Sequence, residues 1–160
     1  MQIAKSAWRC AGHDPNLPTT IDGMLERIRR ERGSGSDFLD LKTGCGGIIE
    51  AEFLVQALQM RENIWEPNWD RAVSGLCGCG LFNDAEAKQL KQSYQLLRRC
   101  ESGLRRYENK AVSSLPTDPD EQRKLAIRLG YHSFENFRRG YVDARDTVDA
   151  LYKRKIKASG

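Results

Sequence analysis

The chain has 160 residues, of which 39% are hydrophobic and 30% are charged, and its formal net charge is +4. This composition suits one ordinary domain, or one piece of a larger protein, with a real core and a highly charged surface. It excludes a disordered tail, a membrane-spanning protein and a dedicated nucleic-acid binder with a dense basic stripe. Since no signal peptide opens the chain, we expect a cytoplasmic protein with no membrane or nucleic-acid partner.

The five cysteines are odd in number and scattered, which argues against a secreted disulfide framework. They are Cys10, Cys45, Cys77, Cys79 and Cys100. Cys77-Gly-Cys79 could seed a metal site, but structural zinc sites generally need two spaced pairs or added histidines, and the sequence has only His13 and His132. We therefore expect reduced thiols and no metal.

The N-terminal part is expected to hold a loop, a helix and extended segments. Glycine and proline interrupt the first twenty residues, which leaves a loop with a short strand around residues 3–10. Thr20 can cap a helix with apolar residues at helical spacing, which the Gly-Ser-Gly-Ser run at 33–36 ends. Phe38, Leu39 and Leu41 then fit a second short strand.

The rest of the chain is predicted to be helical. Residues 48 to about 63 are apolar on nearly all faces, which indicates a central helix buried on more than one side. Further helices are expected from near Asn68, from 84 to about 108 with Asn83 or Asp84 as the cap, from 120 to 129, and after Ser133. The predicted fold class is mainly α, a bundle of four to five core helices with a short extended N-terminal segment.

A glycine cluster precedes the central helix, in the run Lys-Thr-Gly-Cys-Gly-Gly at 42–47. The first N–H groups of a helix have no partner within it, so an anion such as phosphate can bind there, and Lys42 could add a positive charge. The alternative is a purely structural turn before a buried helix. The run matches neither the phosphate-loop pattern nor the dinucleotide-binding pattern.

Two glutamates follow the glycines, and one of them has to face the interior. Glu50 and Glu52 are two positions apart, so on a helix they point about 200° away from each other. We predict that Glu52 faces inward, because the positions around its face are largely apolar. A buried carboxylate needs a partner, which predicts an ion pair with Arg98 or Arg99, and a direct ligand role is the alternative.

A superficial nucleotidyltransferase pattern occurs at residues 33–40, Gly-Ser-Gly-Ser-Asp-Phe-Leu-Asp. On a strand, Asp37 and Asp40 would point to opposite faces and could not share a magnesium ion. We therefore expect no catalytic residue in this chain.

Three motifs in order carry a family resemblance. Residues 40–56, D-L-K-T-G-C-G-G-I-I-E-A-E-F-L-V-Q, resemble the D-I-K-x-G-x-G-G-I-R-D-I-E-F-x-V-Q signature of the glutamine synthetase adenylyltransferase family. Residues 94–101, Y-Q-L-L-R-R-C-E, are similar to that family's A-Y-x-F-L-R-R-L-E helix, and Ser114-Leu115-Pro116 is similar to its T-L-P loop. A looser likeness at 11–15 extends the resemblance over most of the chain.

The resemblance implies a part of a bifunctional enzyme that adds AMP to glutamine synthetase and removes it. Residues 1–46 would be the C-terminal remnant of a nucleotidyltransferase-type domain, and residues 47–160 a helical bundle domain. The chain alone would bind no cofactor and be inactive, while ATP and magnesium would belong to the parent enzyme. Its partners would be glutamine synthetase and the PII regulatory protein. The nucleotide cleft would be bordered by Lys42, Gly44, Gly46, Gly47, Glu50 and Glu52.

This chain departs from the signature at three successive positions, where Ile49, Glu50 and Ala51 replace arginine, aspartate and isoleucine. Loss of the arginine puts a phosphate contact at that position in doubt. Two alternatives stay open. The K-x-G-x-G-G element also resembles PII uridylyltransferase, although Glu52-Phe53 favours the adenylyltransferase, and the chain could instead be a stand-alone helical adaptor that binds protein.

Overall fold

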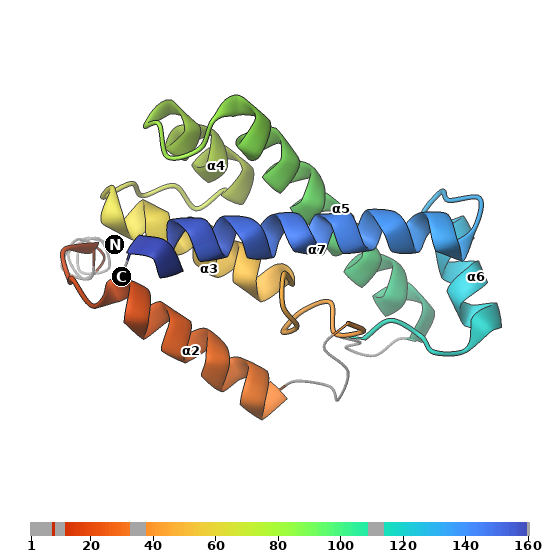
Figure 1. Ribbon diagram of the computed structural model, residues 1–160. Coiled ribbons are helices and arrows are strands. Elements are labelled where there is room, and N and C mark those ends of the chain that lie inside the picture. Colours follow the sequence, from red (N-terminus) through yellow and green to blue (C-terminus); the bar gives the residue numbers. More distant parts are fainter. Residues whose placement is uncertain (1–7, 9–11, 33–37, 109–113, 160) are drawn as a thin grey trace.

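The computed structural model describes residue 8 and residues 12–32, 38–108 and 114–159. Six α-helices and a short 3-10 helix make up most of these residues (Figure 1). Their bounds are α2 Leu17–Arg32, α3 Ile48–Arg61, α4 Trp69–Gly78, α5 Asp84–Glu108, α6 Pro119–Arg128, α7 Phe134–Lys155 and η1 Lys157–Ser159. The predicted mainly α bundle is confirmed.

Several helices begin at polar capping residues. The side chains of Asn68, Asp118 and Ser133 accept hydrogen bonds from the first amides of α4, α6 and α7, which satisfies donors that have no partner within the helix. α2 begins at Leu17, ahead of the predicted cap at Thr20. Pro18 is tolerated there because the first turn of a helix does not use its missing N–H.

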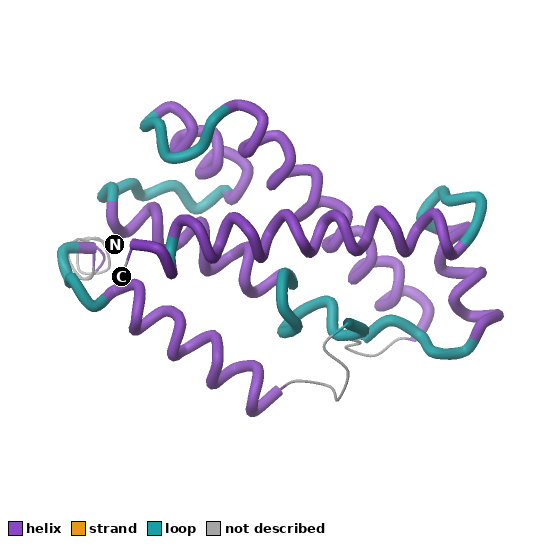
Figure 2. The backbone as a smooth tube through the Cα atoms, viewed as in Figure 1, coloured by secondary structure: helices purple, strands orange, loops and turns teal. Residues whose placement is uncertain are grey.

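The predicted second strand is wrong, and no named strand occurs among the described residues (Figure 2). Residues 38–39 form a turn, and Asp40 makes one isolated antiparallel bridge with Ser114. The cause is Asp40, whose Oδ1 accepts the amides of Lys42 and Thr43 and so bends the chain. The first predicted strand, at 3–10, lies almost wholly outside the described residues, and Trp8 within it is helical.

The buried residues form two clusters, and α7 contributes to both. The first joins α2, α3, α4 and the start of α5 to the C-terminal half of α7, with Val148 and Tyr152 at its centre. The second joins the loop before α3, the middle of α5, and α6 to the N-terminal half of α7, with Phe137 and Tyr141 fully buried. α7 therefore runs along the whole bundle (Figure 1).

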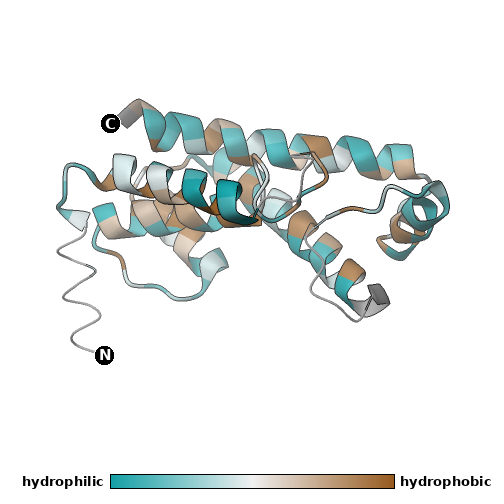
Figure 3. Ribbon diagram, turned by 90° about the horizontal axis from the view of Figure 1, so that it is seen from below, coloured by the Kyte–Doolittle hydropathy of each residue, from teal (hydrophilic) through white to brown (hydrophobic). Residues whose placement is uncertain are grey.

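Residues on both sides of the predicted domain boundary share these clusters. Leu25 of α2 packs in the first cluster and Leu41 in the second, each with residues from beyond position 46. The division into 1–46 and 47–160 stays a prediction. The helices carry both polar and apolar residues, as the mixed colouring of Figure 3 shows, and no described helix is both long and apolar enough to cross a membrane.

Candidate functional site

The glycine motif forms a closed bend between the loop at 38–43 and α3. The bend begins with Asp40, which is 1% exposed and also accepts a hydrogen bond from the Thr43 hydroxyl. Gly46 has a φ of 70°, in the left-handed region that favours glycine. A Cβ on Gly46 would lie 2.2 Å from the carbonyl oxygen of Arg145, so glycine is required for the close approach of α7 as well as for the turn.

The amides of the bend and of the start of α3 are bonded within the protein. Gly47 N donates to Gly44 O, while the amides of Ile48 and Ile49 donate to the carbonyl oxygens of Leu41 and Lys42, at 2.9 to 3.0 Å. These amides therefore have partners in the preceding loop, which favours the structural-turn alternative. The chain folds back so that loop carbonyls take the position that an anion would need.

α7 holds the bend from the opposite side through Arg145. Its Nε donates to Cys45 O at 2.7 Å and its Nη1 donates to Phe38 O at 2.6 Å. The same Nη1 lies 3.0 Å from the hydroxyl of Tyr141. Arg145 is 6% exposed, and a signal for it exists in the sequence, since it lies four residues after Tyr141 on the apolar face of α7.

Glu50, rather than the predicted Glu52, is the glutamate that faces the interior. Glu50 is 1% exposed, and its Oε2 accepts Gly46 N–H at 3.0 Å and pairs with Arg29 of α2. Burial raises the pKa of the Glu50 carboxyl, while Gly46 N–H and Arg29 oppose that rise. The sequence could not identify Arg29 as the partner, because nothing in the local pattern brings α2 against the start of α3.

Glu52 is half-buried, and it is not paired with Arg98 or Arg99. Its Oε1 accepts a hydrogen bond from the Tyr94 hydroxyl at 2.8 Å. Burial and then this carboxylate raise the pKa of Tyr94. The Tyr94 ring stacks on Trp69 at a centroid distance of 3.9 Å, so the contact joins α3, α4 and α5. The predicted ion pair is therefore wrong, and the Glu52 carboxylate instead accepts a hydrogen bond from a neutral hydroxyl.

Lys42, predicted as a cation for an anionic ligand, instead pairs with Glu101 of α5 at 3.1 Å. Arg98 and Arg105 also pair with Glu101, each at 2.9 Å. Glu101 is 4% exposed, so three cations compensate one buried carboxylate. Most of the residues predicted to border a nucleotide cleft thus make contacts within this chain, namely Lys42, the glycines and Glu50. A cleft shared with a further domain stays a prediction.

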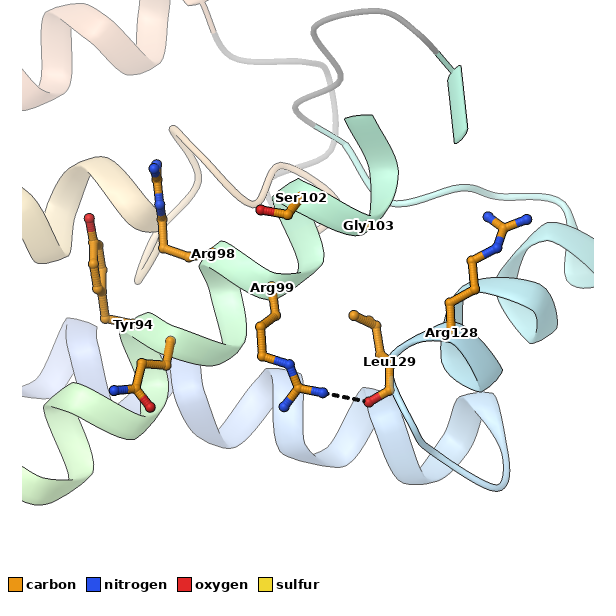
Figure 4. Close-up of a pocket in the computed structure, with 8 residues that line it drawn as sticks. Tyr94, Arg98, Arg99, Ser102, Gly103, Arg128 and Leu129 are labelled. Carbon is orange, nitrogen blue, oxygen red and sulfur yellow. Dashed lines mark hydrogen bonds between the residues drawn. The ribbon is translucent and has the colours of Figure 1, made fainter. Parts of the chain in front are cut away.

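An open groove of about 980 Å³ lies between α5 and α6. Its lining carries three arginines, with Tyr94, Gln95, Ser102, Gly103 and Leu129 between them, and the arginines are Arg98, Arg99 and Arg128. Arg99 donates to Leu129 O at 2.7 Å, which joins the two helices across the groove (Figure 4). A carbonyl is a neutral acceptor, so this bond leaves the positive charge of Arg99 uncompensated.

The groove and the bend differ in what they can bind. Figure 4 shows the Arg98 and Arg128 side chains extending from opposite sides of the groove. Exposed guanidinium groups recognise carboxylates and phosphates by paired hydrogen bonds. The arrangement therefore suits an anionic partner surface. It contains no nucleophile activated by a neighbouring base among its lining residues.

Comparison with known proteins finds similarity over both the bend and the groove. Residues 22–156 match the family model described as GlnD PII-uridylyltransferase. Curated relatives are bifunctional glutamine synthetase adenylyltransferase/adenylyl-removing enzymes. That of Bordetella pertussis is 30% identical over 152 residues, covering 88% of this chain and 16% of the relative. That of Stenotrophomonas maltophilia K279a is 30% identical over 142 residues, covering 84% of this chain and 15% of the relative.

The resemblance found in the motifs is therefore confirmed, and it concerns a limited part of the relatives. A third relative, from Acinetobacter baylyi, is 26% identical over 139 residues and is likewise covered to only 15%. The chain thus spans about one sixth of the length of the curated relatives it matches. Since the family model covers most of the chain, we conclude that this chain belongs to the GlnD PII-uridylyltransferase family.

Proposed function

We propose that this chain is the helical, non-catalytic part of a bifunctional glutamine synthetase adenylyltransferase/adenylyl-removing system. The observation that carries the proposal is the similarity to such enzymes over 88% of the chain at 30% identity. Glutamine synthetase would be the protein acted on, and the bundle would orient a nucleotidyltransferase domain towards it. ATP and magnesium as cofactors of that domain, PII as a second partner, and a cytoplasmic location belong to the same proposal.

The arginine groove supports a protein-contact role for the bundle. Arg98 and Arg99 lie in the segment that resembles the family's A-Y-x-F-L-R-R-L-E helix, and both line the groove. The bonded amides of the bend leave little there for a phosphate to contact, whereas the groove offers exposed guanidinium groups. We infer that the groove contacts an acidic surface of glutamine synthetase.

The test is to measure binding of purified glutamine synthetase to this chain by titration calorimetry, with and without ATP and magnesium. We expect binding that does not require nucleotide, no transfer of AMP by the chain alone, and weaker binding by an Arg98→Glu, Arg128→Glu double variant. The double variant Arg123→Glu, Arg138→Glu is a matched control, because both arginines lie outside the groove lining. Failure to bind glutamine synthetase would contradict the proposal.

A PII uridylyltransferase-like parent is the second candidate, because the matching family model carries that description. PII protein in place of glutamine synthetase in the same titration separates the two candidates. Tight binding of PII together with no binding of glutamine synthetase would favour the second. Binding of glutamine synthetase with no effect on its adenylylation by a complete enzyme would favour a stand-alone adaptor.

A further inference from the structure

Three side chains with metal-binding atoms meet beside the bend. They are Cys45 of the bend, Glu50 of α3 and Asp149 of α7, and one ligand atom from each lies within 4.8 Å of the others. The Cys45 thiol lies 3.1 Å from Asp149 Oδ1 and donates to it. These residues come from three separate segments, so the fold, rather than local sequence, brings them together.

Glu50 supplies an independent sign of a missing ligand. Its side chain is 1% exposed, and its Oε1 is buried with no hydrogen-bond partner. Burying a carboxylate oxygen without a partner is costly, and native proteins rarely leave one in that state. The other oxygen of the same carboxylate is held by Gly46 N–H and Arg29. One oxygen is thus fixed and the other is available.

A neighbouring cation contacts one oxygen of each of the two carboxylates. Lys153 Nζ lies 2.6 Å from Asp149 Oδ2, while Oδ1 of Asp149 faces the Cys45 thiol. Arg29 contacts Oε2 of Glu50 and leaves Oε1. In metal sites, a partner on one oxygen of a carboxylate orients the other oxygen towards the ion. These two cations also offset the negative charge that three anionic ligands would concentrate around one ion.

We propose that Cys45, Glu50 and Asp149 bind a divalent transition-metal ion, with Zn²⁺ as the expected occupant. One sulfur and two carboxylate oxygens match the mixed donors that zinc accepts, whereas magnesium and calcium take oxygen ligands. On binding, the Cys45 thiol releases its proton to solvent and the thiolate sulfur coordinates the ion. A small pocket of about 170 Å³ is lined in part by Cys45 and Asp149, and we expect a water molecule in it to be the fourth ligand.

The proposed ion would connect the bend to α3 and α7, so its effect would be on stability. This role does not depend on the proposed function. It differs from the sequence-based expectation of no metal, which considered Cys77 and Cys79. Those two cysteines lie at the end of α4, and neither belongs to this group of three.

The experiment uses the full chain after treatment with a chelator. Zinc titration by calorimetry should show one ion bound per chain, and added zinc should raise the melting temperature. Cobalt should give a sulfur-to-metal charge-transfer band. Cys45→Ser should weaken zinc affinity by at least about 100-fold. Loss of a residue that only hydrogen-bonds to a metal ligand weakens affinity by at most about that much. Cys45→Ser should also remove the cobalt band.

Cys79→Ser is the matched control, because Cys79 is an exposed cysteine outside the cluster. It should leave affinity and the cobalt band unchanged. Asp149→Asn is a second test in case Cys45→Ser does not fold, because asparagine keeps the shape of this half-buried side chain. Circular dichroism checks that each variant keeps its helices. The proposal is overturned if the wild-type chain binds no zinc, or if Cys45→Ser and Asp149→Asn bind it as tightly as the wild type does.

Discussion

The bend at residues 40–50 and the groove between α5 and α6 both contain motifs of the family, but they are built in opposite ways. In the bend the polar groups are buried and bonded to one another, through Asp40, Arg145 and Glu50. In the groove the arginines are exposed, and one hydrogen bond, from Arg99 to Leu129 O, joins its two sides. A glycine-rich motif with a lysine can therefore serve the fold, while the recognition surface that we propose lies elsewhere.

The largest expected effect distinguishes two glycines that share the same backbone conformation. Gly46→Ala should lower the free energy of unfolding by at least about 4 kcal/mol, since backbone strain adds to a collision with α7. Urea denaturation measures this change. Gly80→Ala is the control, because Gly80 has a φ of 77° with nothing within 4 Å of an added Cβ. Equal losses for the two variants would show that α7 does not press on the bend.

Removing the arginine that holds the bend should have the next largest effect. Arg145→Ala should lower the free energy of unfolding by about 3 kcal/mol, because the partly buried carbonyl oxygens of Phe38 and Cys45 lose a charged donor. Asp146→Ala, at the exposed neighbouring position on α7, should change stability by less than about 0.5 kcal/mol. Thermal and urea melts of the pair test this difference. Similar melts for both variants would contradict the structural role of Arg145.

The two glutamates of α3 should separate in the same assay. Glu50→Ala should lower the free energy of unfolding by about 2 kcal/mol. The loss is smaller than for a fully buried ion pair because Arg29 reaches solvent and because the variant also removes the unpartnered oxygen. Glu52→Ala loses one hydrogen bond from Tyr94 and should cost about 1 kcal/mol. The assay should use chain freed of metal by a chelator. A larger loss at Glu52 than at Glu50 would restore the original sequence-based assignment.

Groove substitutions should have the smallest effect on stability. Arg98→Gln removes one partly exposed ion pair with Glu101, which keeps Lys42 and Arg105, so the expected loss is below about 0.5 kcal/mol. Glutamine synthetase binding by the same variant should fall measurably. If the variant instead loses stability and keeps full binding, Arg98 stabilises the fold, as the bend residues do, and does not bind the partner.

The helices were predictable because their signals are local. Asn68 and Ser133 cap their helices through their own side chains, and the sequence places the starts of both helices at these residues. The strand expected at 38–41 failed because the apolar pattern there is shared by strands and buried turns, and the bonds from Asp40 to following amides decide the outcome.

The candidate site was predictable only in part, because its partners are distant in the sequence. Periodicity indicated that one of Glu50 and Glu52 faces inward, but the choice depends on Arg29, which is 21 residues before Glu50. α3 is apolar on several sides, so the helix itself gave no preferred direction. The contact of Cys45 with Asp149, which is 104 residues away, has no local signal at all.

The position of α7 across both buried clusters has a consequence for how the protein opens. Tyr141 belongs to one cluster and Val148 to the other, and Arg145 lies between them on the same helix. Neither half can lose its packing against this helix unless the helix breaks in the middle or moves away from both clusters. Amide hydrogens on the two sides should therefore exchange with solvent through a shared opening event, with similar protection, rather than as two independent units.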